Sequence, residues 1–507
     1  MNPNDTWLSE TNSPKAVIAI LFGSIDDLTI EHCLSLYPKG LLVVCEESLP
    51  IREQIQSISA KTNIHDFLKV LSEFLLIDPV NRPEVKISSS IPKEEFPTYE
   101  TLANHTLNQI DTTQRARRTR KETGFIRQMQ VFSNLPGYLL SRLPEQWKGI
   151  GKGKIALVIG AGPSLDITLE LISNITPTPI IIATDSSLRA LKMSQVDPDF
   201  VISIDPEKTF DSCSNPDFTP GTLIISSQAH PSWSEKWNGK SRYISGRVLF
   251  EDWLSEKGIG KTSLHAINNA GLTALAMADF LDPAVIILVG MDMSGKGDGS
   301  TRYAKLTGRD HIQTLSQIYH EIPGNFCESV KTPFLSDWQE TSEFCKKISA
   351  KRIVINLNDD GAFLDGTNPI HPNEFPELVN LLAANIKSSE RFPLSLTDQR
   401  RTIHDVGKVQ VLTLLAKKCD EVWEKLEKED FSPKRIVNEI FQDKDLSTML
   451  GDFSFSIMPS LVSGDKSLCH ESIIRELKNI IWKLEDAILA SSPPESFLIK
   501  FLSEKFH

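Results

Sequence analysis

Two continuous hydrophobic runs, separated by a helical stretch, dominate the first hundred positions of the chain. Residues 16–22 and 41–45 are apolar throughout, and residues 28–37 between them are compatible with a helix. Such runs joined by a helix are typical of parallel strands buried on both faces of a sheet. The proline-rich stretch 83–97 that follows predicts irregular chain or a sheet edge. We therefore expect residues 1–100 to form a small α/β domain.

Further apolar runs alternate with helical stretches in the middle of the chain. The predicted strands are residues 155–159, 180–183, 200–204, 223–225, 285–289 and 353–355. Predicted helices begin near Ser164 and Ser186, and another covers residues 272–281. Strands that alternate with helices predict a doubly wound, Rossmann-like α/β sheet for the central domain, residues 151–375.

The remaining segments are predicted to be helical. Residues 101–150 form a connector whose basic run, residues 115–121, is interpreted as a solvated helix face, with an anion-facing or partner-facing patch as the alternative. Residues 376–507 form a helical domain, because apolar residues recur there at spacings of three and four. The two stripes are Leu412, Leu415, Cys419, Val422 and Leu426, and Ile473, Leu477, Ile480, Leu484 and Ile488. Neither stripe is long enough for a coiled-coil oligomer, so we expect packing within the chain.

The composition is that of an ordinary globular protein with an acidic balance. The sequence has 54 Lys and Arg against 66 Asp and Glu, a formal net charge of −12, and 40% hydrophobic residues. These values exclude collagen-like and wholly disordered classes, and they argue against a general nucleic-acid binder. The seven cysteines contain no CxxC pair, so no zinc site is expected. No long apolar run and no signal-like start occur, so we expect no membrane span and a cytoplasmic location.

The strongest candidate for chemistry is the turn Ile-Gly-Ala-Gly-Pro-Ser-Leu-Asp, residues 159–166, directly after a strand. Gly160 and Gly162 permit a tight turn and close approach of a ligand. Pro163 and Ser164 can start the following helix. The turn would then present exposed N–H groups at a positive helix end, a site for phosphate or carboxylate. It lacks the third glycine of a dinucleotide fingerprint and the lysine of a P-loop, and a purely structural turn is an equal alternative.

Acidic residues follow three other predicted strands, at the sheet edge where ligands of open α/β sheets bind. Asp185 and Ser186 could hold a sugar hydroxyl or could simply cap a helix. Asp205 could contact a ligand or form a turn with the proline that follows it. Asp292 begins the glycine-rich loop 293–301, which could fold over a ligand or be an ordinary mobile loop.

Basic side chains and histidines complete the set of candidates. Lys296 and Arg302, after Asp292, could meet a phosphate or a carboxylate. A general base could be any histidine of the α/β region, although each singly is more often a surface or core residue. These histidines are His230, His265, His311 and His320. The Gly-x-Ser-x-Gly pattern of a serine hydrolase is absent.

Four of these motifs, in one order, resemble the motility-associated-factor (Maf) glycosyltransferases, whose core is also called the 6-hydroxymethylpterin diphosphokinase MptE-like domain. The motifs are residues 162–166, residues 183–191, residues 198–201 with Asp205, and residues 288–294. Residues 356–362 and Thr332 resemble the end of the family's domain. The likeness covers roughly residues 125–370 and implies a fold similar to that of certain bacterial sialyltransferases.

The resemblance implies transfer of a nonulosonic (sialic-like) acid from a CMP-sugar to Ser or Thr of flagellin, in support of flagellar assembly and motility. It places the turn 160–164 at the CMP phosphate or the sugar carboxylate, and Asp185 and Asp205 in the nucleotide pocket. Asp292 would lie near the reacting centre. Residues 301–304 stand where the family often has Thr-His-Ala, so the expected bases are His265 and His311. No metal or other cofactor is expected, because CMP carries less charge than a nucleoside diphosphate.

Two alternatives stay open. Other members that share this core imply ATP-dependent diphosphate transfer to a pterin alcohol, with Mg²⁺ held by carboxylates such as Asp185, Asp205 or Asp292. A non-catalytic interaction protein is the other alternative, because a helical C-terminus suits a partner-binding module. The N-terminal domain resembles the family's degenerate nucleotide-binding-like first domain. Only Gly23 remains of its glycine-rich turn, so we interpret that domain as structural or acceptor-recognising.

Overall fold

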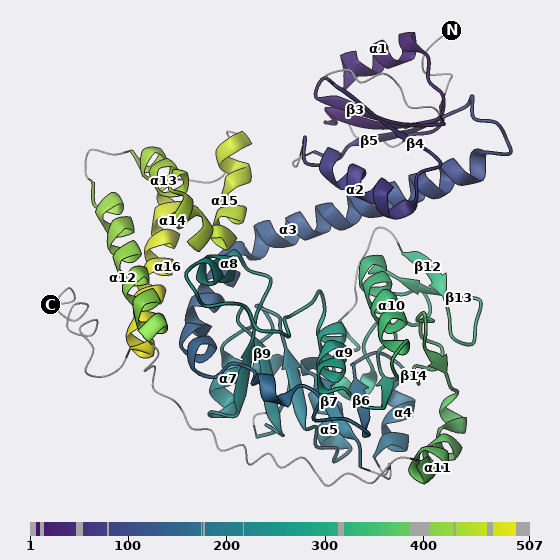
Figure 1. Ribbon diagram of the computed structural model, residues 1–507, viewed down its shortest axis with the longest axis vertical. Helices are drawn as coiled ribbons and strands as arrows, with labels where there is room; N and C mark the ends of the chain where they lie inside the picture. Colours follow the sequence, from purple (N-terminus) through teal and green to yellow (C-terminus); the bar gives the residue numbers. More distant parts are fainter. Residues whose placement is uncertain are drawn as a thin grey trace. The chain divides into compact units, whose positions relative to one another are not determined.

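The computed structural model divides the chain into two compact units, Met1–Glu122 and Thr123–His507 (Figure 1). It describes residues 7–10, 15–46, 54–78, 81–173, 175, 178–215, 217–312, 319–385, 406–428, 432–463 and 470–492. Helix α3 (Phe96–Leu140) continues from the first unit into the second. The C-terminal helices belong to the same unit as the central sheet, whereas the predicted domain boundaries at residues 100, 150 and 375 stay predictions.

The first unit contains a five-stranded sheet of mainly parallel strands. In spatial order they are β1 (Trp7–Glu10), β5 (Glu84–Ser88), β2 (Ile18–Phe22), β3 (Gly40–Cys45) and β4 (Ile55–Ser59). Only β1 is antiparallel to its neighbour. Side chains that alternate along β2 and β3 enter two cores, one containing residues of α1 (Asp27–Leu36) and the other residues of α2 (Ile64–Phe74) and α3. Burial on both faces explains the uninterrupted apolar runs.

The expectation of irregular chain or an edge at residues 83–97 is wrong for residues 84–88 and for the helix that begins at Phe96, whereas residues 89–95 between them are irregular, as expected. Strand β5 lies inside the sheet, between β1 and β2, and Pro97 lies in the first turn of α3, where a missing N–H breaks no helical hydrogen bond. Gly23, at the end of β2, has a φ of +113°, and a Cβ atom there would lie 2.8 Å from Cγ1 of Ile91. The end of β2 is therefore filled by the chain that follows β5.

An eight-stranded parallel sheet forms the centre of the second unit. In spatial order its strands are β10 (Ser241–Ile244), β9 (Thr222–Ser226), β8 (Phe200–Ser203), β7 (Ile180–Thr184), β6 (Ile155–Ile159), β11 (Val285–Val289), β14 (Ile353–Asn356) and β15 (Asn368–Pro369). The chain starts at β6, proceeds outward to β10, and then crosses to β11 on the other side of β6. This order confirms the predicted doubly wound sheet, with its topological switch between β6 and β11.

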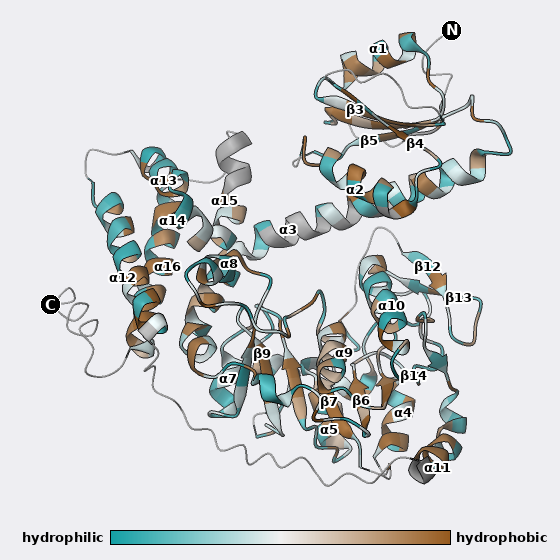
Figure 2. Ribbon diagram, in the orientation of Figure 1, coloured by the Kyte–Doolittle hydropathy of each residue, from teal (hydrophilic) through white to brown (hydrophobic). Residues whose placement is uncertain are grey.

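Helices cover both faces of this sheet (Figure 1). Helices α9 (Ala270–Leu281) and α10 (Leu335–Ser349) contribute to one core, and α4 (Leu165–Ile172), α5 (Leu188–Met193) and α11 (Phe375–Asn385) contribute to the other. Figure 2 shows hydrophobic residues concentrated on the strands between these layers. The shorter elements are η2 (Glu145–Trp147), η3 (Asp185–Ser187), α6 (Phe210–Cys213), α7 (Ser232–Trp237), α8 (Leu249–Glu256), η4 (Lys305–Thr307), η5 (Pro372–Glu374) and the hairpin β12 (His320–Pro323) with β13 (Ser329–Thr332).

The C-terminal helices confirm the prediction of packing within the chain. They are α12 (Val406–Leu426), α13 (Pro433–Gln442), α14 (Lys444–Met449), α15 (Gly451–Ser463) and α16 (His470–Ser491). Both predicted stripes are buried in one core, which also contains Phe132 of α3 and Leu223 of β9. In the part of the chain that the structure describes, no helix has both the length and the apolar character needed to cross a membrane.

Candidate functional site

The glycine turn packs against the loop that follows β11, at the topological switch of the sheet. The backbone N–H groups of Gly160 and Gly162 donate to the carbonyl oxygens of Val289 and Gly290, each at 2.8 Å. A Cβ atom at Gly160 would lie 2.2 Å from the carbonyl oxygen of Gly290. Both glycines are therefore required by the close approach of two segments of this chain.

The carboxylate of Asp292 occupies the start of α4. Its Oδ1 accepts a hydrogen bond from the Ser164 N–H at 3.1 Å, and its Oδ2 accepts one from the Ser164 hydroxyl at 2.8 Å. A Cβ atom at Gly162 would lie 2.1 Å from the same Oδ2. The expected row of exposed amides is therefore wrong, because the N–H groups of Gly160, Gly162 and Ser164 are bonded within the protein. A helix N-terminus favours an anion, and here the protein supplies its own.

Asp292 is a positioning residue for the turn in this structure. Its side chain is 5% exposed, and burial raises its pKa to about 7, although the two hydrogen bonds from Ser164 act in the opposite direction. The charge of Lys296, whose own side chain is exposed, also lowers the pKa of Asp292. The carboxyl group of Asp292 can therefore change its protonation state near neutral pH.

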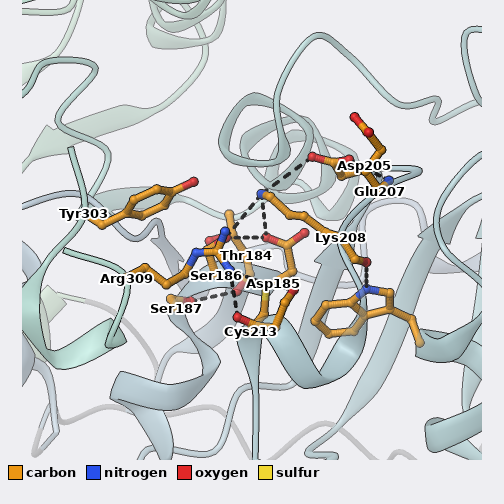
Figure 3. Close-up of polar contacts among 12 residues, drawn as sticks. Thr184, Asp185, Ser186, Ser187, Asp205, Glu207, Lys208, Cys213, Tyr303 and Arg309 are labelled. Carbon is orange, nitrogen blue, oxygen red and sulfur yellow. Dashed lines mark hydrogen bonds and ion pairs between the residues drawn. The ribbon is translucent and has the colours of Figure 1, made fainter. Parts of the chain in front are cut away.

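A second polar cluster lies where β7 and β8 end, and Lys208 is at its centre (Figure 3). The Nζ atom of Lys208 is 3.4 Å from Oδ1 of Asp185, 3.2 Å from the hydroxyl of Ser186 and 4.0 Å from Oδ2 of Asp205. Since β7 and β8 are adjacent and parallel, their carboxyl ends bring these acidic residues together. Lys208 itself follows Asp205 by three residues, and its carbonyl oxygen accepts a hydrogen bond from Nε1 of Trp233 at 2.8 Å.

Asp185 combines complete burial with an unused hydrogen-bond acceptor. Its Oδ1 accepts hydrogen bonds from the Ser186 hydroxyl, at 2.9 Å, and from Lys208, whereas Oδ2 has no hydrogen-bond partner among the described residues. Burial acts to lower the pKa of Lys208, but the negative charges of Asp185 and Asp205 raise it above its ordinary value. Lys208 is therefore charged at neutral pH. Leaving a buried acceptor without a donor is unfavourable, so Oδ2 of Asp185 is well suited to accept a hydroxyl or amino group of a ligand.

The loop after β11 carries Arg302, Tyr303 and Arg309, and Figure 3 shows Tyr303 and Arg309 beside this cluster. This loop is tied to the glycine turn, because the Ala304 N–H donates to the carbonyl oxygen of Ala161 at 3.0 Å. The carboxylate of Asp166 accepts hydrogen bonds from the backbone N–H groups of residues 305 and 306, each at 3.0 Å. Arg309 donates from Nη1 to the carbonyl oxygen of Ser212 at 2.7 Å. The glycine turn thus supports the cationic loop instead of offering free amides.

The candidate histidines His265 and His311 do not contact Asp292 through a hydrogen bond or an ion pair among the described residues. His265 follows β10 and is exposed, and it forms an isolated bridge with Ser245. His311 follows η4 and is also exposed. Their predicted role as a general base stays a prediction.

Lys208, Tyr303 and Arg309 are site residues that the sequence interpretation did not identify. Each lies in irregular chain, where no hydrophobic period marks its position. The signals that could have found them are local. An Asp-Pro turn reverses the chain just before Lys208, and a Tyr with two nearby arginines follows the glycine-rich loop.

The carboxylates named as possible magnesium ligands lie in two places. Asp185 and Asp205 face the ammonium group of Lys208, whereas Asp292 is bonded to Ser164. Across the described ranges, no group of three or more His, Cys, Asp or Glu side chains could hold a metal ion. The ammonium group of Lys208 already occupies the position between Asp185 and Asp205.

Comparison with known proteins matches a segment that contains part of this site, from the glycine turn to Asp292. Residues 129–298 match the family model described as 6-hydroxymethylpterin diphosphokinase MptE-like, which confirms that part of the resemblance. A solved structure of a MAf glycosyltransferase from Magnetospirillum magneticum AMB-1 is similar over 96% of this chain and 82% of that chain, with 14% identity and a TM-score of 0.48. No curated protein matches the sequence.

Proposed function

We propose that this protein is a glycosyltransferase that moves a nonulosonic (sialic-like) acid from a CMP-sugar to Ser or Thr of flagellin or another protein acceptor in the cytoplasm, in support of motility. The observation that carries the proposal is the pairing of Asp185 with Lys208 at the ends of the central strands. A buried carboxylate oxygen without a donor suits a hydroxyl or amino group of a nucleoside, and the ammonium beside it suits a phosphate.

The proposed reaction breaks the bond between the anomeric carbon and the phosphate oxygen of the donor. CMP departs with the bonding electrons, and the oxygen of the acceptor hydroxyl bonds to the anomeric carbon while its proton passes to a base. Side-chain cations stabilise the charge of the leaving group, as in other reactions with anionic leaving groups. We propose His265 or His311 as the base, and Ser186 and Asp205 as further donor contacts. No metal or other cofactor is proposed, because a single phosphate can be neutralised by these cations.

The structure changes how the glycine turn contributes to this proposal. Its amide N–H groups donate to the carbonyl oxygens of Val289 and Gly290 and to the carboxylate of Asp292. We therefore propose that the turn and Asp292 position the site and do not contact the donor. The cations that face a donor phosphate are then those of Lys208, Arg302 and Arg309. Lys296 is exposed on the same loop and is kept as a proposed donor contact.

A transfer assay with intact-mass detection tests the proposed reaction. Flagellin would be incubated with the protein and a CMP-activated nonulosonic acid, and we expect its mass to rise by one or more sugar residues. Asp185→Asn should slow the transfer at least about tenfold, the loss typical of one charged hydrogen bond. Asp211→Asn is the matched control, because Asp211 is an exposed acid on α6. No transfer by the wild type, or equal rates for wild type and Asp185→Asn, would contradict the proposal.

The diphosphokinase alternative is supported by the description of the matching family model. A parallel reaction with ATP, magnesium and hydroxymethyl-dihydropterin tests it, because diphosphate transfer releases AMP. We expect no AMP under the proposed glycosyl transfer. Absence of both products would instead favour a non-catalytic interaction protein.

A further inference from the structure

Two guanidinium groups share the ring of Tyr303. The Cζ atoms of Arg302 and Arg309 lie 4.9 Å and 5.1 Å from the centroid of that ring, and Arg302 also lies 4.8 Å from the ring centroid of Phe334. Nη2 of Arg302 donates to the Tyr303 hydroxyl at 3.0 Å. Stacking on aromatic rings holds each guanidinium in a fixed plane, but it supplies no anion to balance the two charges.

Each arginine keeps a buried donor that the protein does not use. The Nε atoms of Arg302 and Arg309 are buried and have no hydrogen-bond partner within the described part of the chain. The Arg309 side chain is 9% exposed, and its bond to Ser212 fixes the direction of the remaining N–H groups. Two unused N–H groups on neighbouring guanidiniums are well suited to the oxygen atoms of phosphate or carboxylate.

Lys208 adds a third cation to the same cluster. Figure 3 shows the Tyr303 hydroxyl and the Arg309 guanidinium pointing toward the Lys208 ammonium. Lys208 is paired with the carboxylates Asp185 and Asp205, and Arg302 and Arg309 lie at the Tyr303 ring. Together these three cations and two carboxylates carry a formal charge of 3 − 2 = +1. The imbalance matches one negative charge, which is the charge of the phosphodiester that joins CMP to its sugar.

We infer that Arg302, Arg309 and Lys208 form an anion site around Tyr303 that binds the phosphate of the donor nucleotide. This inference rests on the proposed function, and it moves the phosphate away from the amides of the glycine turn, where Asp292 already supplies the anion. Asp185 lies 3.4 Å from Lys208, so a nucleoside held there by its hydroxyl or amino group would carry its phosphate to the cations. The carboxylate of the sugar is the other oxyanion of the donor, and the experiment separates the two.

Calorimetric titration with CMP, cytidine and a free sialic acid tests the assignment. We expect the wild type to bind CMP at least about tenfold more tightly than cytidine. Arg302→Gln and Arg309→Gln should each remove most of that preference while leaving the affinity for cytidine unchanged. Arg302→Lys should restore part of it, since it keeps the charge but loses the forked donors. Lys305→Gln is the matched control, because its exposed cation lies between the two arginines in sequence.

Three results would overturn the inference. The first is equal affinity of the wild type for CMP and cytidine. The second is an equal loss of affinity for CMP and for cytidine in Arg302→Gln. The Arg302 side chain is partly exposed, so this variant is less prone to misfold than Arg309→Gln. The third is weakened binding of the sialic acid with unchanged binding of CMP, which would assign the cations to the sugar carboxylate.

A nucleotide-independent measurement separates this inference from the proposed function. If the wild type binds no nucleotide, the proposed function fails, and thermal unfolding in inorganic phosphate then tests the anion site alone. Phosphate should raise the Tm of the wild type and of Lys305→Gln, but raise that of Arg302→Gln much less. Equal shifts in all three proteins, or no shift in any, would overturn the site.

Discussion

Replacing Asp292 with Asn tests the finding that this carboxyl group is buried beneath the glycine turn. The amide oxygen of Asn can still accept the hydrogen bond from the Ser164 N–H, so the turn keeps one of its two contacts with this position. Asn cannot ionise, however. The substitution therefore removes the titration of the group with little change of its shape.

The expected effect follows from the pKa of Asp292, which is about 7 in the folded protein against an ordinary value of 3.8. Between these values the folded state binds one more proton than the unfolded state, so the contribution of Asp292 to stability falls as the pH rises. The slope is about 1.4 kcal/mol per pH unit for one proton. The contribution is greatest below about pH 4, declines between pH 4 and 7, and is constant above.

Denaturant unfolding followed by tryptophan fluorescence measures this effect, since every tryptophan except Trp7 lies in the second unit. The free energy of unfolding of Asp292→Asn minus that of the wild type should increase from pH 5 to pH 7 and then level off. Asp298→Asn is the control, because Asp298 lies on the same loop and is fully exposed. A difference that stays constant from pH 5 to pH 7 would refute the burial of Asp292.

Three further substitutions test other parts of the structure. Gly162→Ala would place a methyl group 2.1 Å from a carboxylate oxygen, so we expect a loss of about 1–3 kcal/mol and a lower Tm, whereas Gly260→Ala, with open space around it, should leave the Tm unchanged. Lys208→Met leaves the buried carboxylate of Asp185 without its cation and should destabilise the second unit by about 3–5 kcal/mol in urea unfolding; an unchanged midpoint would contradict the ion pair. Leu484→Ala in the C-terminal core should cost about 2–5 kcal/mol, and a loss below 1 kcal/mol would show that α16 is not packed as described.

The sequence predicted the sheet well where burial on both faces leaves an unbroken apolar run. Strands β6 and β11 were predicted at their exact residues, because no polar position interrupts them. Strand β5 was missed, since Glu84 and Lys86 interrupt its pattern although both are buried. Local pattern alone does not reveal such buried charges.

The candidate site was predicted only as far as strand ends could be recognised. Asp185 and Asp205 were identified because adjacent parallel strands end at one edge. The bond from Ser164 to Asp292 joins residues 128 positions apart, so it depends on the crossover from β10 to β11 and not on any local motif. For the same reason, the meeting of Lys208 with Tyr303 could not be anticipated from the sequence.

The most direct test of the account is a structure of the protein bound to CMP. We predict that the phosphate oxygens lie within hydrogen-bond distance of Lys208 and the two arginines that flank Tyr303, and that a nucleoside hydroxyl or amino group donates to Oδ2 of Asp185. CMP bound instead with its phosphate on the amides of residues 160–164, with the carboxylate of Asp292 displaced, would contradict the account.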